Sequence, residues 1–287
     1  MEPTRQRTMK NALPLTHKNG INFLDLSNNS CDAELSLYGG QLLSWQPKGQ
    51  HPVLWMSETA RLDGSGAIRG GIPICWPWFG VVDGKGRHGL VRNRVWQLDA
   101  YSRQTDITTV QLSIELDDTV NPWPHPNRLE MQLSIGRELH QTLSMRNDTD
   151  EALSVTCALH SYFAVSAPSN VSIAKLAGKT YYDHIRVVHG LTDTGDEPYV
   201  GPIDRIYESG ASVTFIDNGW KRKLEIEKSG SEQWVLWNPG SEANTIADIH
   251  SQGQDGFICL EAAQTAPRTI HPGEEYRLSQ SLRVAPI

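Results

Sequence analysis

The sequence lacks several features that would assign it to common classes of protein. No run approaches the ~18 apolar residues that span a bilayer. Residues 1–20 contain no apolar core of a signal peptide, so we expect a cytoplasmic protein without a membrane partner. Positive charge is also scarce: 26 Lys and Arg against 33 Asp and Glu give a net charge of -7. This balance argues against a nucleic-acid partner.

Cysteine is rare as well. The 287 residues include 4 cysteines, Cys31, Cys75, Cys157 and Cys259, which are far apart in the sequence. Such spacing predicts reduced thiols, not a disulfide framework or a zinc site. The sequence therefore gives no reason to expect a metal.

Helical periodicity is weak, whereas period-two alternation of apolar and polar residues is common. It runs through residues 110–116, 129–135, 153–159 and 276–284, and it predicts half-buried strands separated by turns. The best helical candidate is the short segment 242–249. We predict an all-β protein with few short helices, in which large antiparallel sheets pack as a sandwich. A polar segment, residues 1–20, would precede a single domain, residues 21–287.

Two neighbouring segments, residues 69–80 and 88–93, are rich in glycine, proline and aromatic residues. Glycine permits close approach of the backbone, and proline stiffens its path. Arginine forks suit a phosphate or carboxylate, and aromatic faces suit a sugar ring. The segments indicate a pocket for a small polar anion, with Arg69 and Arg92 as the anion fork and three aromatic walls: Trp76, Trp78 and Phe79. The alternative is a tight corner of a sheet, which has a similar composition.

Two ionisable residues stand at the ends of predicted strands. His160 follows the strand 153–159, and its parity places it opposite Leu159, on the more polar face. Glu261 ends the apolar run 257–260, where a buried carboxylate is costly unless it is paired. Burial could raise the pKa of Glu261 into the range of a general base. The alternatives are an ordinary hydrogen-bonded histidine and a strand that emerges at the sheet edge.

Other polar positions carry weaker signals. Asp204 follows Gly201-Pro202, and Trp237 precedes the turn Asn238-Pro239-Gly240. Each could line a pocket, but an exposed turn is the default interpretation. The loop histidines His184 and His189 are expected to be solvated.

Several of these segments, taken in order along the chain, resemble one family. They are residues 67–73, 76–80, 88–93, 158–163 and 237–240, and the similarity extends from residues 39–45 to residues 281–284. The chain resembles the hexose-6-phosphate mutarotases, the glucose-6-phosphate 1-epimerase branch of the aldose 1-epimerase (galactose mutarotase-like) superfamily. That resemblance implies a β-supersandwich fold.

The resemblance also implies a reaction, the interconversion of the α and β anomers of glucose 6-phosphate by ring opening at C1, without a cofactor. His160 and Glu261 match the catalytic residues. Arg69 and Arg92 match positions associated with the phosphate. Among the remaining positions, His88 and Asp204 match sugar contacts, and we expect Trp237 to bind substrate too. Residues 242–250 depart from the family pattern, so the role of the loop 242–256 beside Glu261 and the fine substrate preference stay open. We expect a monomer.

Two alternatives belong to other classes. A non-catalytic protein that binds or senses sugar phosphates would keep the arginines and aromatic residues without accelerating any reaction. A metal-dependent enzyme could use His88, His160 and Glu261 as ligands, although no close His-x-His pair supports it.

Overall fold

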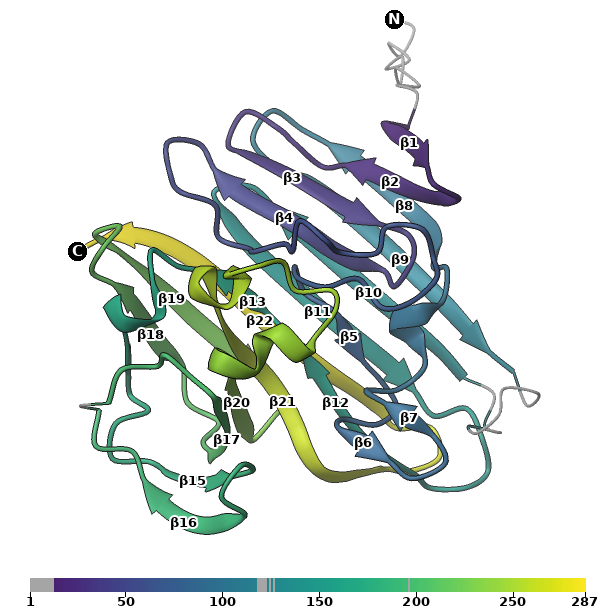
Figure 1. Cartoon of the computed structure of the whole chain (residues 1–287). Coiled ribbons are helices and arrows are strands. Elements are labelled where there is room, and N and C mark those ends of the chain that lie inside the picture. The colour runs from purple at the N-terminus through teal and green to yellow at the C-terminus, as the bar shows by residue number, and fades with distance from the viewer. Residues whose placement is uncertain (1–12, 118–122, 124, 126, 196) are drawn as a thin grey trace, which may run out of the picture.

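Three antiparallel sheets and a short hairpin make up the computed structural model, which describes residues 13–117, 123, 125, 127–195 and 197–287 (Figure 1). The first eight-stranded sheet contains, in spatial order, β14 (Val171–Ala174), β18 (Val213–Asp217), β19 (Arg222–Ser229), β22 (Glu275–Pro286), β11 (Glu138–Arg146), β10 (Asn127–Ile135), β9 (Thr108–Leu116) and β8 (Gln97–Arg103).

The second large sheet carries the functional pocket described below. Its order is β16 (Val188–Thr192), β15 (Thr180–Asp183), β17 (Ile203–Glu208), β20 (Gln233–Asn238), β21 (Phe257–Ile270), β12 (Leu153–Leu159) and β5 (Ile74–Cys75), and β13 (Tyr162–Ala164) also pairs with β21. A third sheet contains β1 (Leu15–Lys18), β2 (Ile21–Asp25), β3 (Cys31–Ser36) and β4 (Gln41–Pro47), and β6 (Val81–Val82) pairs with β7 (Gly86–Arg87).

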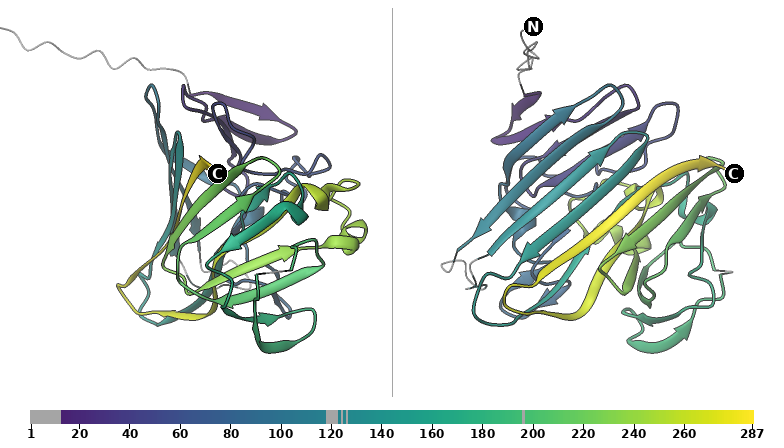
Figure 2. Two further views of the ribbon diagram at one scale, coloured as in Figure 1. Left: turned by 90° about the vertical axis from the view of Figure 1, so that its left-hand side faces the viewer. Right: turned by 180° about the vertical axis from the view of Figure 1, so that it is seen from behind.

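The sheets pack face to face over one large apolar core. Figure 2 shows the sheet of β8–β11 and β22 as one layer and the other sheets facing it. The inward side chains of β10, such as Leu129 and Met131, belong to the same buried cluster as Val155 and Leu159 of β12. Alternate residues of strands such as β10 and β11 are buried in this core, as the period-two pattern predicts. The predicted all-β fold is confirmed, and the four predicted strands correspond to β9, β10, β12 and β22.

Helices in the described residues are short 3₁₀ turns: η1 (Val91–Asn93), η2 (Pro168–Asn170), η3 (Gly240–Thr245) and η4 (Gly253–Gly256). The helix predicted over residues 242–249 is therefore wrong in type and in extent. The turn begins at Gly240, whose backbone N–H bonds to Asn238 Oδ1 at 2.7 Å, and it ends before Ile246. Tight turns of this kind need few residues and no amphipathic stripe.

The start of the third sheet bears on the expected domain boundary. Strand β1 lies inside the segment 1–20 and pairs with β2, although its four residues are exposed. Residues 1–12 lie outside the described part of the chain. A single domain over residues 21–287 stays a prediction.

Candidate active site

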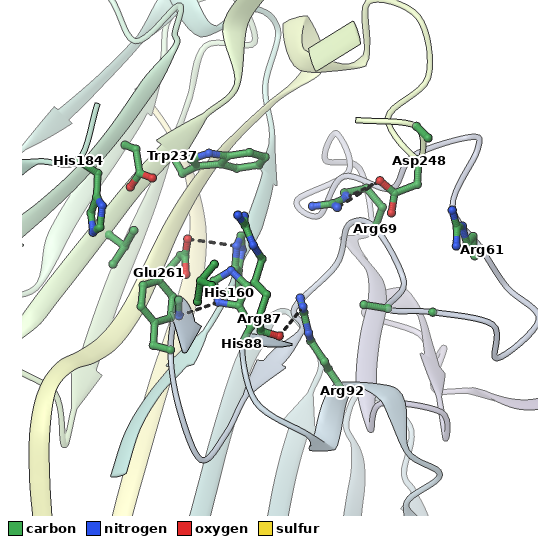
Figure 3. A pocket seen from close by; sticks show the side chains of 18 residues that line it. Arg61, Arg69, Arg87, His88, Arg92, His160, His184, Trp237, Asp248 and Glu261 are labelled. Atoms are coloured by element: carbon green, nitrogen blue, oxygen red, sulfur yellow. Dashed lines mark hydrogen bonds and ion pairs between the residues drawn. The ribbon is translucent and has the colours of Figure 1, made fainter. Parts of the chain in front are cut away.

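A pocket of about 590 Å³ opens at the second large sheet, and all seven predicted site residues line it (Figure 3). They are Arg69, His88, Arg92, His160, Asp204, Trp237 and Glu261. The residues come from separate parts of the chain, and the antiparallel pairing of β17, β20, β21 and β12 brings several of them onto one face. The volume falls in the range that holds a small ligand.

Glu261 lies within the central strand β21, which pairs with β20 on one side and with β12 on the other. Glu261 is only 1% exposed. The strand does not emerge at a sheet edge at this point, because β21 continues to Ile270. That alternative is therefore wrong, and the carboxylate is buried in the sheet.

His160 follows β12 and faces Glu261 across the floor of the pocket. Its Nε2 lies 3.3 Å from Glu261 Oε1. The predicted parity is confirmed, because Leu159 packs in the main core while His160 lines the pocket. This face is the more polar one, with Ser154 exposed and Thr156 half-buried, but His160 itself is only 7% exposed.

The surroundings shift the pKa values of Glu261 and His160 so that both side chains favour their uncharged forms. Burial, followed by the charge of Asp204, raises the pKa of Glu261 well above its usual value. Burial, followed by the proximity of His88 and the positive charges of Arg69 and Arg92, lowers the pKa of His160 well below its usual value. Since the protein's own groups favour an uncharged pair, the two side chains hold one transferable proton between them.

His88 contributes a neutral hydrogen-bond donor. The backbone N–H of Gly80 donates to its Nδ1 at 3.2 Å, so the ring proton sits on Nε2. Burial and the charges of Arg92 and Arg87 lower the pKa of His88 to about 3. The ring stands edge-on to His160 with centroids 5.5 Å apart. His88 is therefore suited to bind a hydroxyl oxygen and unsuited to carry a proton at neutral pH.

The backbone after His88 depends on a glycine. Gly89 has φ +76, and a Cβ there would lie 1.8 Å from the carbonyl oxygen of Trp76. We expect Gly89→Ala to lower the free energy of unfolding by about 2–4 kcal/mol, through left-handed strain and overpacking. Denaturant unfolding would measure this.

Gly84→Ala is the matched control. Gly84 has φ +69, but nothing lies within 4 Å of its added Cβ. The control should lose no more than about 1–2 kcal/mol. Equal losses in the two variants would contradict the close approach at Gly89.

Arg69 lies on the opposite side of the pocket from His184 (Figure 3). Its Nε donates to Asp248 Oδ1 at 3.2 Å, its Nη2 lies 3.1 Å from the same oxygen in an ion pair, and its Nη1 donates to the Tyr162 hydroxyl at 2.8 Å. Asp248 belongs to the unaligned segment 242–250, so that segment completes this wall of the pocket. Arg69 is therefore held in place by an ion pair and by a hydrogen bond to a neutral phenol.

Arg92 is fixed by the β6–β7 hairpin. Its Nη2 donates to the backbone carbonyl of Arg87 at 2.8 Å. Within the described residues, its buried Nε has no hydrogen-bond partner. The Arg87 guanidinium points towards Trp237 in Figure 3, and both residues line the pocket. Together with Arg61 and Arg69, four arginines therefore line the pocket.

The predicted aromatic walls need correction. Phe79 lines the pocket, as expected. Trp76 does not: it is 1% exposed and packs in the main core. Trp78 also points away from the pocket, because its Nε1 donates to the carbonyl of Gly86 at 3.2 Å. The second wall is Trp237, whose ring stands edge-on to His160.

Sequence reasoning missed four polar lining residues: Arg61, Arg87, His184 and Asp248. His184 is exposed, as expected, but it also lines the pocket, next to Asp204, whose carbonyl accepts its backbone N–H. Arg87 could have been found, since it directly precedes His88. Arg61 stands in a segment with no motif, and Asp248 stands in the segment that was wrongly predicted to be a helix.

Within the residues that the structure describes, no group of three or more His, Cys, Asp or Glu side chains is arranged to hold a metal ion. All four cysteines are free and buried, which confirms the expected thiols. No described helix is long and apolar enough to cross a membrane.

Comparison with known proteins gives a consistent result. The sequence model of the aldose 1-epimerase family matches residues 23–283. A Salmonella typhimurium protein provisionally named glucose-6-phosphate 1-epimerase is 31% identical over 284 residues, covering 95% of this chain and 94% of the relative. A protein of the same provisional name from Cenchrus ciliaris is 31% identical over 271 residues, covering 90% and 82%.

A solved structure is similar over the same extent. The crystal structure of a Salmonella typhimurium protein provisionally described as a mutarotase superposes with a TM-score of 0.89 at 29% identity. The match covers 96% of this chain and 94% of that one. This agreement confirms the expected galactose mutarotase-like β-sandwich.

Proposed function

The chain belongs to the aldose 1-epimerase family, and from that premise we propose that it interconverts the α and β anomers of hexose 6-phosphates, with glucose 6-phosphate as a substrate. The observation that carries this proposal is the contact of His160 Nε2 with Glu261 Oε1 at 3.3 Å on the floor of a pocket walled by arginines. The two oxygens that exchange protons during anomerisation are bonded to the same carbon. Two groups this close can reach both at once.

The proposed reaction is a pair of proton transfers. Glu261 accepts the proton of the C1 hydroxyl while His160 donates one to the ring oxygen, so that the bond from C1 to the ring oxygen breaks and a C1 aldehyde forms. The C1–C2 bond then rotates, and the ring closes on the other face of the aldehyde with the two roles reversed. No atom is gained or lost, so no co-reactant is needed.

This reaction requires an ionised Glu261 beside a protonated His160, whereas the protein's own groups favour the uncharged pair. Binding of the substrate's phosphate can favour the ionised pair. Arg69 and Arg92 are among the causes that lower the pKa of His160. A phosphate bound to these arginines would offset their positive field and move the proton towards His160. The phosphate would thus assist the chemistry as well as the binding.

The polar walls suit the rest of the substrate. His88 presents a neutral Nε2–H donor, and Asp204 presents a carboxyl group whose pKa is raised by burial. Trp237 offers an aromatic face above the catalytic pair (Figure 3). Sugar rings combine hydroxyl groups with apolar faces, so donors, acceptors and an aromatic ring in one cavity match them.

A substrate panel tests the proposal. Polarimetry or a coupled anomer assay would measure kcat/KM on phosphorylated and free hexoses. We expect turnover of both kinds, with glucose 6-phosphate favoured over glucose. Tight binding of sugar phosphates without any rate increase would identify a binding or sensing protein instead.

Chelation separates the proposed reaction from a metal-dependent one. We expect extensive dialysis against a chelator to leave the rate of anomerisation unchanged, because the two proton transfers need no Lewis acid. The same assay before and after dialysis measures this. A loss of rate that a divalent ion restores would overturn the proposed mechanism.

A further inference from the structure

Tyr162 contacts both His160 of the proposed catalytic pair and Arg69 of the proposed anion site, but it does not line the pocket itself. It is the first residue of β13, pairs with Cys259 of β21 and is 2% exposed. Its ring packs in an aromatic cluster, with centroids 5.8 Å from Trp55 and 5.1 Å from Phe257. A buried ring with partners on several sides has little freedom to move.

One face of this ring supports the catalytic histidine. The rings of Tyr162 and His160 are stacked, with centroids 4.9 Å apart and planes 11° apart. A functional histidine is usually oriented by a hydrogen bond to its second ring nitrogen. In the described residues the Nδ1 of His160 has no such partner. The orientation of the His160 ring therefore depends on packing, and Tyr162 provides the parallel face.

The hydroxyl of the same residue supports an arginine of the anion site. Burial raises the pKa of Tyr162, so the phenol stays neutral. Its oxygen accepts a hydrogen bond from Arg69 Nη1 at 2.8 Å, while Asp248 Oδ1 accepts one from Nε at 3.2 Å and lies 3.1 Å from Nη2 in an ion pair. A guanidinium has five N–H groups, and the two hydrogen bonds use two of them. The remaining N–H groups can bind a ligand, in a plane that Tyr162 and Asp248 define.

We propose that Tyr162 is a positioning residue that joins the two halves of the site: its ring orients His160 for proton transfer, and its hydroxyl orients Arg69 for the phosphate. This inference rests on the proposed function. It predicts that the ring affects kcat and that the hydroxyl affects the KM for glucose 6-phosphate. Each part can be removed by its own substitution.

The hydroxyl is tested by Tyr162→Phe. This variant keeps the stacked ring, so we expect kcat to stay within about twofold of wild type. The KM for glucose 6-phosphate should rise roughly tenfold, the size expected for one hydrogen bond to a charged group. The kcat/KM for glucose should not change, since glucose has no phosphate.

A double-mutant cycle shows whether the hydroxyl acts through Arg69. In the Arg69→Ala background, Tyr162→Phe should have no further effect on KM for glucose 6-phosphate. If it raises KM by the same factor in both backgrounds, the hydroxyl acts elsewhere and this half of the proposal is wrong.

The ring is tested by Tyr162→Leu. Loss of the parallel face should lower kcat on glucose 6-phosphate and on glucose alike, by roughly tenfold or more, and should shift the pH profile of kcat. Phe163→Leu is the matched control, because Phe163 is the next residue of β13 and is fully buried, but its ring packs against Phe215 in the main core. The control should lose stability and keep its kcat.

Two outcomes would overturn the role of the ring: an unchanged kcat in Tyr162→Leu, or an equal loss of kcat in the Phe163→Leu control. Thermal unfolding of each variant checks that it is folded, and Tyr162→Met replaces the leucine variant if that variant is not. Failure of the proposed function would show in the wild-type protein, as an absence of turnover. A wild type that is active while its Tyr162 variants show neither effect would contradict this inference alone.

Discussion

Replacing Glu261 by glutamine is expected to lower kcat for anomerisation at least a hundredfold. Glutamine has the size of the buried acid and is uncharged, as the surroundings of Glu261 favour, so the fold should be retained. It cannot accept the proton of the C1 hydroxyl. A positioned general base contributes ~10²–10⁴-fold to a rate. Polarimetry on freshly dissolved α-glucose would measure the loss, and the coupled assay would measure it for glucose 6-phosphate.

The same loss is expected for His160→Asn, which removes the partner 3.3 Å away. Both variants should still bind glucose 6-phosphate in a calorimetric titration, because the arginines are untouched. The double variant should be little slower than either single variant, since the two residues act as a unit. If either single variant kept more than about a tenth of the wild-type rate, the role assigned to that residue would be wrong.

Arg69→Ala and Arg92→Ala are each expected to lower kcat/KM for glucose 6-phosphate by ten- to a hundredfold. A charge-assisted hydrogen bond contributes roughly 1.5–3 kcal/mol, and each arginine faces the pocket with N–H groups that can bind the phosphate. Turnover of free glucose should change by less than about threefold, because the proton-transfer pair remains. The measurement is kcat/KM for both sugars in each variant.

Lysine variants provide the control for charge. Arg69→Lys and Arg92→Lys keep the positive charge but lose the fork, so they should recover part of the loss and no more. If the alanine variants lose efficiency equally on both sugars, the arginines support the fold and the phosphate binds elsewhere.

The strands could be predicted from the sequence because one physical pattern determines them. A sheet with one buried face requires alternation, and residues 129–135 show it without interruption. The segment 242–249 was harder, because its turn starts before it, at Gly240, whose backbone N–H bonds to the side chain of Asn238. The sequence could not predict which way the side chains of Trp76 and Trp78 point either, since the Gly- and Pro-rich backbone around them has no regular period.

In the candidate site, too, some features could be predicted from the sequence and others could not. Glu261 could be found because a carboxylate at the end of an apolar run is costly wherever the strand lies. The contacts of Arg69 could not: its partners Asp248 and Tyr162 are 179 and 93 residues away in the sequence. Such contacts follow from the pairing of distant strands and from loops between them, and no local pattern encodes them.

The most direct test of the account follows the anomers themselves. In an equilibrated solution of glucose 6-phosphate, the C1 protons of the two anomers give separate NMR signals, and exchange spectroscopy measures their rate of interconversion. The account predicts that a catalytic amount of the protein accelerates this exchange and that the Glu261→Gln variant at the same concentration does not. An exchange rate that is the same with the wild-type protein as without it would contradict the central claim.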